Sequence, residues 1–206
     1  MTLVRYAAEQ LDEESQTNIL VVELRPGVAV DTARLSRHFY TASSCGVCGK
    51  ASIDLVQTHT CYQLNPEAPV LSQSVLHRLP GSLFEQQDVF SCTGGLHAAG
   101  LFDASGLPVL LREDVGRHNA VDKLIGAALQ KNLIPLSNHI LLVSGRAGFE
   151  LVQKSLMGGI PVMAAVGAPS SLAVELADTY GMTLVGFLRE GRFNVYTGKQ
   201  RINLTS

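Results

Sequence analysis

The sequence predicts a three-layer α/β protein built on a largely parallel or mixed sheet. Strand-like apolar runs alternate with stretches of helical length through most of the chain, as in sheets whose strands are connected by covering helices. Hydrophobic residues make up 46% and charged residues 17% of the 206 positions, which predicts a substantial buried core. No fixed-period repeat and no long linker divides the chain, so we expect a single domain.

The N-terminal segment is expected to hold one strand and one helix. The first 17 residues are polar and predict a helical or loosely ordered start. Residues 18–24 (NILVVEL) predict a buried strand that ends at Pro26-Gly27. Asp31 is a suitable N-cap for a helix that continues to Tyr40.

Residues 41–50 (TASSCGVCGK) are small or polar around two cysteines, and they predict a mobile loop. We therefore divide the chain into an N-terminal strand and helix segment at 1–40, this loop, and an α/β domain at 51–206.

The α/β domain is expected to begin with a helix over Leu71–Leu79, broken at Pro80-Gly81. The strands expected after it are Val89–Cys92, Val109–Arg112, His139–Val143, Val162–Val166 and Met182–Leu188. The expected helices are Leu96–Leu101, Arg117–Lys131, Gly148–Met157 and Ser170–Tyr180. Because binding residues gather where strands of such sheets end, we expect function at 91–95, 113–118, 144–148 and 167–171.

Charge and composition exclude several classes of partner. Lys plus Arg is 16 and Asp plus Glu is 18, so a net charge of −2 provides no strong field for duplex nucleic acid or an anionic membrane. With 6% aromatic residues and no Trp, extensive base stacking is not expected. The N-terminus is not a signal peptide, and the apolar runs are far shorter than the roughly 18 residues that span a bilayer. We expect a cytoplasmic protein with no nucleic-acid or membrane partner, in which a local anion site stays possible.

The main chemical motif is Cys45-Gly-Val-Cys48, and three interpretations of it stay open. A structural zinc site needs four ligands, but Cys61 and Cys92 stand apart from the pair. A thioredoxin-like dithiol normally opens a helix directly after a strand. The third interpretation is a sulfur relay, in which an accessible thiolate takes sulfur from a persulfide and a second thiol helps to release it. Lys50 supplies a nearby cation for such a thiolate.

Zinc deaminase chemistry is not supported by the residues. Such enzymes use His-x-Glu followed by Pro-Cys-x-x-Cys, and the Glu moves protons. This chain has His97-Ala98-Ala99, and its CxxC lies before that segment rather than after it.

Several longer stretches together resemble the formate dehydrogenase accessory sulfurtransferases, the FdhD family. They are SSCGVCGK at 43–50, FSCTGGLHAAGLFD at 90–103, EDVGRHNAVDKLIG at 113–126, SGRAGFELVQKSLMGGIPVMAAVGAPSSLAVELA at 144–177 and LVGFLREGRFNVYTG at 184–198. The resemblance implies a cytidine deaminase-like fold without the deaminase metal site, a homodimer, and no metal of the protein's own. Family members generally carry further N-terminal sequence, so we expect that this chain lacks part of it.

The resemblance also implies a function and a reaction. The family takes sulfur as a persulfide from a cysteine desulfurase, and passes it to the molybdenum or tungsten centre of bis-molybdopterin guanine dinucleotide for formate dehydrogenase. By position, Cys45 would carry the persulfide and Cys48 would be its partner. The family's cofactor-binding stretch corresponds to Phe187, Leu188, Arg189, Glu190, Gly191 and Arg192.

Other residues are suited to the phosphates and guanine of such a cofactor. Thr93-Gly94-Gly95 and Ser144-Gly145-Arg146 each follow an expected strand and precede an expected helix, a geometry that favours phosphate binding. Ordinary tight turns are the alternative there, and a solvent-exposed hairpin turn is the alternative around Glu190-Gly191. His97 either assists proton transfer or hydrogen-bonds the cofactor, and a structural histidine is the alternative.

The remaining polar and sulfur-containing residues carry weaker expectations. The residues of a polar cluster at a helix start either cap and solvate that helix or belong to the site; they are Asp114, Arg117, His118, Asn119 and Asp122. Cys92 is expected to be buried and inert, and the methionines expected in the core are Met157, Met163 and Met182. The functional alternative to a sulfur carrier is a non-catalytic cofactor-binding chaperone whose cysteines are structural or redox-active.

Overall fold

The computed structural model describes residues 3–6, 20–29 and 62–204. Contacts divide the chain into two compact units, Met1–Gly46 and Val47–Ser206. In the first unit, strand β1 (Leu3–Tyr6) pairs antiparallel with β2 (Leu20–Glu23). The predicted strand near residues 18–24 is therefore confirmed, but its predicted burial is wrong because Val22 and Leu24 are exposed.

Other predictions for the N-terminal segment fare differently. A helical or loosely ordered start is wrong at Leu3–Tyr6, where β1 forms. The predicted helix over Asp31–Tyr40 and the predicted loop over 41–50 lie outside the described residues.

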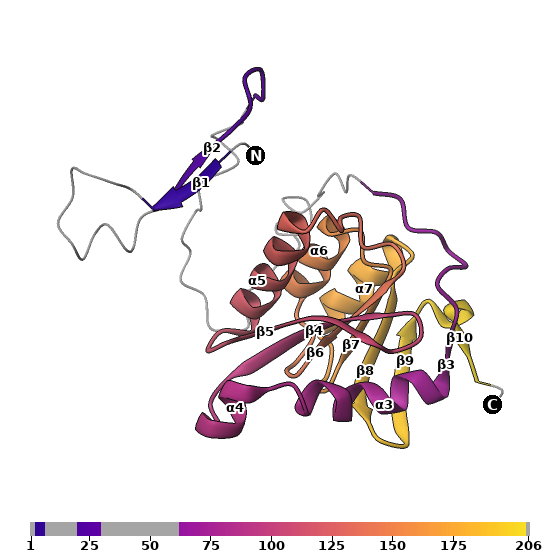
Figure 1. Ribbon diagram of the computed structural model, residues 1–206. Coiled ribbons are helices and arrows are strands. Elements are labelled where there is room, and N and C mark those ends of the chain that lie inside the picture. Colours follow the sequence, from indigo (N-terminus) through magenta and orange to yellow (C-terminus); the bar gives the residue numbers. More distant parts are fainter. Residues whose placement is uncertain (1–2, 7–19, 30–61, 205–206) are drawn as a thin grey trace. The chain divides into compact units, whose positions relative to one another are not determined.

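The second unit is built on a six-stranded sheet with the order β5-β4-β6-β7-β8-β9 (Figure 1). Its strands are β4 (His97–Asp103), β5 (Pro108–Asp114), β6 (His139–Val143), β7 (Val162–Ala165), β8 (Thr183–Arg189) and β9 (Arg192–Thr197). The central strands β6, β7 and β8 are parallel, while β4 runs antiparallel to β5 and β6, and β9 runs antiparallel to β8. The predicted mixed sheet is confirmed.

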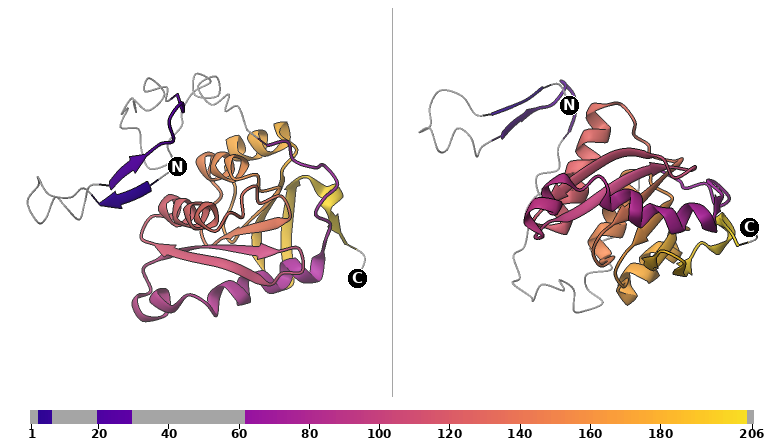
Figure 2. Two further views of the ribbon diagram at one scale, coloured as in Figure 1. Left: turned by 45° about the horizontal axis from the view of Figure 1, so that its top comes forward. Right: turned by 60° about the horizontal axis from the view of Figure 1, so that its bottom comes forward.

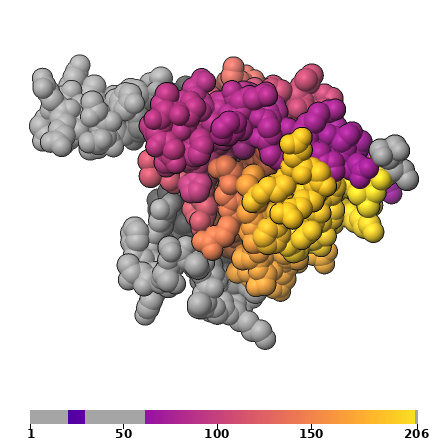
Figure 3. All heavy atoms as spheres, turned by 90° about the horizontal axis from the view of Figure 1, so that it is seen from below, coloured from indigo at the N-terminus to yellow at the C-terminus, as the bar shows by residue number. Residues whose placement is uncertain are grey.

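Helices cover both faces of this sheet (Figures 1 and 2). One face carries α5 (Arg117–Gln130), α6 (Phe149–Met157) and α7 (Ser171–Thr179). The other face carries α3 (Gln73–Phe84), and α4 (Asp88–Thr93) follows it in the chain. In the view from below, the magenta α3–α4 segment lies beside the yellow C-terminal strands (Figure 3). A short 3-10 helix, η2 (Lys199–Arg201), leads into β10 (Ile202–Asn203), which pairs parallel with β3 (Leu71–Ser72).

The side-chain alternation of the central strands explains the three layers. In β6, Leu141 and Val143 pack with α5, α6 and α7, whereas Ile140 and Leu142 pack with α3. All four side chains are at most 1% exposed, because successive residues of a strand point to opposite faces and both faces are covered.

Two predicted elements are exchanged in type. The predicted strand over Val89–Cys92 is the helix α4, and the predicted helix over Leu96–Leu101 is the strand β4. The Glu113 carboxylate of β5 accepts hydrogen bonds from the backbone N–H groups of Val89 and Phe90, so a contact distant in sequence stabilises the first turn of α4.

Small residues suit β4 to its central position. Ala98 and Ala99 are buried on opposite faces, and a Cβ on Gly100 would lie 2.6 Å from Leu83 Cδ1. Helical propensity predicted the wrong element because packing between two helical layers requires small side chains here.

Helix α3 also extends further than predicted. Ser72 caps its N-terminus by accepting a hydrogen bond from the Val75 backbone N–H, and the helix continues through Pro80 to Phe84. The extra turn buries Leu83 against the sheet, which offsets the missing proline donor.

The other predicted strands and helices of the α/β domain are confirmed to within two residues at every end. Met163 and Met182 are fully buried as predicted, but Met157 at the end of α6 is 44% exposed, so its predicted core position is wrong. No helix among the described residues is long and apolar enough to cross a membrane.

A buried arginine fastens the segment around residues 65–68 to the end of the sheet. Arg201 is fully buried, and its Nε donates to the carbonyls of Asn65 and Ala68 at 3.1 and 3.0 Å. Its Nη1 donates to the Gly181 carbonyl at 2.8 Å and to the Thr183 hydroxyl at 3.1 Å. Desolvation lowers the pKa of Arg201, and these acceptors take the place of water around its charge.

Candidate functional site

The loops that leave the parallel strands β6 and β7 run side by side with β8 at the carboxyl edge of the sheet. The Gly167 N–H donates to the Gly145 carbonyl at 2.9 Å, and the Phe187 N–H donates to the Gly167 carbonyl at 3.0 Å. These main-chain hydrogen bonds keep the loops next to one another in the same sequence as the strands β6, β7 and β8. Two of the four predicted functional loops, 144–148 and 167–171, are neighbours in this arrangement.

Phe187 has an uncommon backbone conformation at this edge. Gly186 pairs with Asn194 and Arg189 pairs with Arg192, so Phe187 and Leu188 together face one residue of β9 and form a bulge. Phe187 has φ of 52°, in the left-handed region that is costly for a bulky side chain. Its ring is 45% exposed, while Leu188 is buried in the core.

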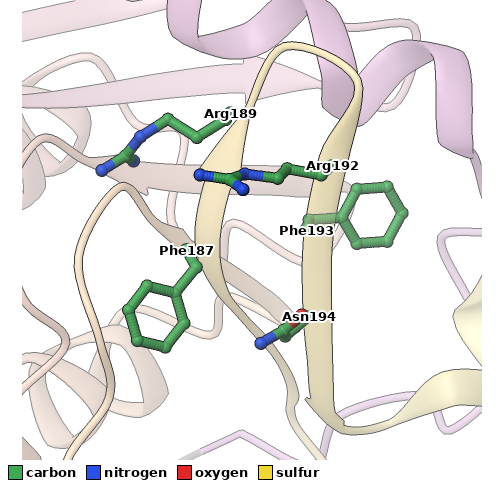
Figure 4. A pocket seen from close by; sticks show the side chains of 5 residues that line it. All are labelled: Phe187, Arg189, Arg192, Phe193 and Asn194. Carbon is green, nitrogen blue, oxygen red and sulfur yellow. The ribbon is translucent and has the colours of Figure 1, made fainter.

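A pocket of about 330 Å³ opens on the β8–β9 hairpin, and five residues line it (Figure 4). They are Phe187, Arg189, Arg192, Phe193 and Asn194. The rings of Phe187 and Phe193 point to opposite sides in this view, and Phe193 packs beside His77 of α3 with ring centroids 5.1 Å apart.

The polar side chains of the pocket differ in how many hydrogen bonds they form within the protein. Arg189 Nη1 donates to the carbonyls of Val166 and Leu188, which fixes the guanidinium beside the β7 loop. The side chains of Arg192 and Asn194 have no hydrogen-bond partner within the described part of the chain. An arginine and an amide are therefore available to a ligand next to an exposed aromatic ring.

The hairpin turn considered as the alternative around Glu190-Gly191 is present between β8 and β9, and Gly191 takes φ of 81° in it. Of the predicted stretch 187–192, three side chains line the pocket: Phe187, Arg189 and Arg192. Sequence analysis missed Asn194, which the two-residue period of a strand places on the same face of β9 as Arg192.

His97 and the 144–148 loop meet at the start of β4. The Ala98 N–H donates to Ser144 Oγ at 2.9 Å, and the Ser144 N–H donates to the Ala98 carbonyl at 3.0 Å. Ser144 therefore fastens this loop to β4. A Cβ on Gly145 would lie 3.4 Å from both Cε1 and Nδ1 of the His97 ring, so the imidazole stands directly beside the glycine. Arg146 is exposed in the same loop.

The polar cluster at the start of α5 is partly structural. Asp114 Oδ1 accepts from the Gly116 N–H at 2.8 Å, and Asp114 also forms an ion pair with Lys123. The hydrogen bond from Lys123 is the largest cause that lowers the Asp114 pKa to about 2. The N-cap of α5 is Gly116, so Asp114 does not cap the helix itself.

The residues of α5 next to this cluster face α6. His118 Nε2 lies 3.6 Å from Glu150 Oε2, and Asp122 forms an ion pair with Lys154. Asp122 and Lys123 are thus both engaged by charged partners rather than only solvated.

Thr93-Gly94-Gly95 does not have the predicted setting. It follows the helix α4 and precedes the strand β4, the reverse of the expected order. Gly94 closes α4 with φ of 67°, so its left-handed conformation explains the glycine. Cys92 is exposed on α4, so the prediction that it is buried in a strand is wrong.

The cysteine motif itself lies outside the described residues, as does Cys61. Within residues 62–204 and the short N-terminal strands, no group of three or more His, Cys, Asp or Glu side chains is placed to hold a metal ion. The zinc interpretation of the CxxC motif stays untested by the structure.

Comparison with known proteins identifies relatives over almost the whole chain. Sulfur carrier proteins FdhD from Streptomyces avermitilis and Streptomyces coelicolor are 54% and 53% identical over 203 residues, which cover 98% of this chain and 72% of each relative. Sulfur carrier protein FdhD of Sulfurisphaera tokodaii is 45% identical over 95% of this chain and 75% of its own length.

The structural comparison agrees with these relatives. A crystal structure from Desulfotalea psychrophila, assigned as a formate dehydrogenase accessory protein, superimposes with a TM-score of 0.60 at 32% identity. The superposition covers 66% of this chain and 62% of that one. The profile of the FdhD/NarQ family matches residues 5–203. The chain belongs to the FdhD/NarQ family.

Proposed function

We propose that this protein is a sulfur carrier required for formate dehydrogenase activity. It accepts persulfide sulfur from a cysteine desulfurase and delivers it to bis-molybdopterin guanine dinucleotide. The observation that carries the proposal is the pocket on the β8–β9 hairpin, where the exposed ring of Phe187 and the unpartnered side chain of Arg192 both belong to the stretch that the family resemblance assigns to the cofactor. The relatives named as sulfur carrier proteins support the same function.

The sulfur-transfer step is assigned to Cys45 and Cys48. The Cys45 thiolate attacks the outer sulfur of the donor persulfide, and the donor's S–S bond breaks as its cysteine leaves as a thiolate. Once the acceptor is bound, the Cys48 thiolate attacks the Cys45 sulfur, and the carried sulfur leaves as hydrosulfide toward the acceptor. This step oxidises the two cysteines to a disulfide, which exchange with a cellular dithiol reduces.

The acceptor fits the residues of the edge. Phe187 offers a flat apolar face to a guanine base, and Arg192 and Asn194 offer donors to its carbonyl and to phosphate oxygens. Arg189 is fixed by main-chain carbonyls and adds positive charge at the same place. The predicted cofactor contacts of Ser144, Gly145, Arg146 and His97 lie along the same edge of the sheet.

The finer properties of the protein rest on the family resemblance. We propose a cytidine deaminase-like fold without a metal of its own, a homodimer, a cytoplasmic location, and formate dehydrogenase as the protein that receives the completed cofactor. Cofactor contacts at Thr93, Gly94 and Gly95 stay a prediction, without the strand-to-helix geometry that first suggested them.

Intact-protein mass spectrometry after incubation with a cysteine desulfurase and free cysteine tests the carrier function. We expect one sulfur-sized mass increase on wild type and on Cys48→Ala, and none on Cys45→Ala. Cys92→Ala is the matched control, because Cys92 is an exposed free thiol that could take sulfur nonspecifically. It should keep the full mass increase.

A second readout separates the carrier from a non-catalytic chaperone. Cys45→Ser should abolish maturation of formate dehydrogenase while leaving guanine nucleotide binding intact. If the variant matures the enzyme as well as wild type does, the covalent step is wrong and the chaperone alternative holds.

A further inference from the structure

We propose that His97, Arg117 and the backbone at Gly145 form a phosphate-binding site, separate from the pocket on the β8–β9 hairpin. It would take a phosphate or diphosphate group of an extended ligand. The inference rests on the proposed function only for the identity of the molecule that carries this group.

Arg117 is a positive charge without an acidic partner in the described structure at this end of the edge. Two nearby carboxylates are already engaged, Glu113 by the N–H groups of α4 and Asp114 by Lys123, and Glu150 Oε2 lies 3.6 Å from His118 Nε2. Arg117 has no acidic partner among residues 62–204. Its Nε is buried without a hydrogen-bond acceptor in the described structure. A buried donor of a charged group without an acceptor is costly, so an anion is expected to complete it.

The missing side chain of Gly145 leaves space between His97 and Arg117. A Cβ there would lie 3.4 Å from the His97 ring and 3.7 Å from Arg117 Cδ, so these two side chains flank the position that a larger residue would fill. The φ of Gly145 lies outside the left-handed region, so its conformation does not require glycine. The two hydrogen bonds between Ser144 and Ala98 hold the loop in this position. A bare backbone beside an imidazole and a guanidinium suits the close approach of a ligand.

The start of α5 adds backbone N–H donors to the site that His97, Arg117 and Gly145 form. This helix of 14 residues begins at Arg117, and its N-cap Gly116 has no side chain that could satisfy the first N–H groups. Among the backbone N–H groups of this turn, Asp114 accepts that of Gly116, and its Oδ1 also accepts from Asn119 Nδ2 at 3.2 Å. The first-turn N–H groups of a long helix favour an anion, and Arg117 presents a planar fork that matches phosphate oxygens.

The distance between the two sites suits one extended ligand. Gly145, Gly167 and Phe187 are joined in succession by main-chain hydrogen bonds. Two steps of about 4.8 Å between neighbouring strands put the sites about 10 Å apart. A dinucleotide can therefore place its base against Phe187 and a phosphate at Arg117.

Calorimetric titration of the full chain with inorganic pyrophosphate tests the site. Arg117→Gln should weaken pyrophosphate binding by about tenfold or more, because it removes a charge-assisted contact. Arg78→Gln is the matched control: Arg78 is exposed on α3, and among the described residues its side chain makes only a long hydrogen bond, 3.5 Å, to the Ser105 carbonyl. Binding to this variant should be unchanged.

A second variant tests the same site without altering a charge. Gly145→Ala should fold normally, because 3.4 Å is an ordinary van der Waals contact, yet its methyl group occupies the proposed phosphate position. Pyrophosphate binding should weaken, and the pyrophosphate-induced shift of the His97 imidazole NMR signals should shrink. Thermal melting of both variants confirms that they are folded.

The outcomes distinguish this inference from the proposed function. Binding that Arg192→Gln weakens and Arg117→Gln leaves unchanged would overturn the inference, because pyrophosphate would then occupy only the hairpin pocket. Absence of pyrophosphate binding to wild type would overturn it as well. Neither result touches persulfide formation on Cys45, which tests the sulfur carrier independently.

Discussion

Phe187 takes a left-handed backbone conformation, with φ of 52°, although its side chain is among the bulkiest. In ordinary positions such a conformation costs roughly 1–2 kcal/mol. The bulge in β8 imposes it, and the result is that the ring stands at the mouth of the hairpin pocket. Because this conformation costs free energy and places the ring in the pocket, we expect the ring to contribute to binding rather than to stability.

Phe187→Gly should therefore separate stability from binding. We expect the free energy of unfolding to stay level or rise by up to about 1 kcal/mol, because glycine adopts this conformation without strain. Guanine nucleotide binding should fall by about tenfold, because the aromatic face is lost. Urea denaturation and nucleotide titration measure the two quantities.

Asn132→Gly is the control for this variant. Asn132 also has a left-handed backbone, with φ of 56°, but it follows α5 and lines no part of the pocket. Its variant should keep full nucleotide affinity. Equal loss of affinity in both variants would show that the effect of Phe187→Gly is not local.

Asp114 provides a pH-dependent test of the α5 turn. Its pKa is lowered to about 2, first by the hydrogen bond from Lys123 and then by that from the Gly116 N–H. A carboxyl with a lowered folded-state pKa adds stability above its unfolded pKa of about 3.9, and this stability is lost as the pH falls toward 2. In Lys123→Ala, the Asp114 pKa should rise, and the pH dependence of unfolding between about pH 4 and 2 should weaken.

Carboxyl NMR titration measures this pKa directly, and Asp103 is the internal reference. The pKa of Asp103 is also lowered, chiefly by the Ser105 hydroxyl, and Lys123 has no part in it. An Asp103 pKa that moves together with that of Asp114 would show a general change in the fold instead of a lost ion pair.

The family resemblance predicted part of the site. It assigned residues 187–192 to the cofactor, and the structure places Phe187 and both arginines of that stretch, Arg189 and Arg192, on one pocket. Asn194 and the unpaired Arg117 could not be singled out from the sequence. Whether such a side chain is available to a ligand depends on which neighbours have already formed hydrogen bonds. That information exists only after the chain has folded.

At the scale of elements, α4 and β4 show where sequence reasoning failed. Val89, Phe90 and Cys92 favour a strand by propensity, and His97-Ala-Ala favours a helix. Glu113 reverses the first preference from the neighbouring strand, and burial between two helical layers reverses the second. The elements from α5 to β8 were predictable, because their apolar periodicity agrees with their burial.

At the end of β9, replacement of Gly198 by a larger residue should strongly lower the free energy of unfolding. A Cβ on Gly198 would lie 2.3 Å from Thr183 Oγ1 and 2.6 Å from Thr183 Cα. Gly198→Ala should lower the free energy of unfolding by roughly 3–5 kcal/mol, since it adds overlap to left-handed strain.

Gly181→Ala is the matched comparison, because Gly181 has nearly the same φ, 64° against 67°, and open space around its missing side chain. Its variant should lose only about 1–2 kcal/mol. Denaturation curves that show equal losses for the two variants would contradict the steric argument.

The hydrogen bonds of Arg201 should contribute substantially to stability, because they join the segment around residues 65–68 to the end of the sheet. Lysine cannot reach the carbonyls of Asn65, Ala68 and Gly181 together, so Arg201→Lys should destabilise the domain by about 2 kcal/mol. Arg78→Lys, at an exposed arginine of α3, should change stability by less than about 0.5 kcal/mol. Hydrogen exchange at residues 62–70 should accelerate only in the Arg201 variant.

On the scale of the whole molecule, charge is distributed unevenly. The net charge is −2, yet Arg117, Arg146 and Arg192 lie along one edge without an acidic partner in the described structure. A local excess of positive charge attracts anions although the protein as a whole repels them weakly. The composition predicted the absence of a global field, and only the fold shows where the local one lies.

This arrangement predicts that ligand binding depends on salt. Raising sodium chloride from about 0.05 to about 0.5 M should weaken binding of guanosine diphosphate by about tenfold, because screening acts on the phosphate contacts. Uncharged guanosine is the control, and its weaker binding should hardly change. A diphosphate affinity that is independent of salt would place the phosphates away from the arginines.

The main-chain bonds from Gly145 to Gly167 and on to Phe187 have a consequence for how this edge can diversify. Since the spacing of the loops is set by groups that every residue except proline possesses, substitution of most side chains leaves that spacing intact. Ligand preference can then be retuned at single positions such as Arg192 or Asn194 without rebuilding the framework that presents them. The same main-chain framework can thus carry different side chains in relatives that bind different ligands.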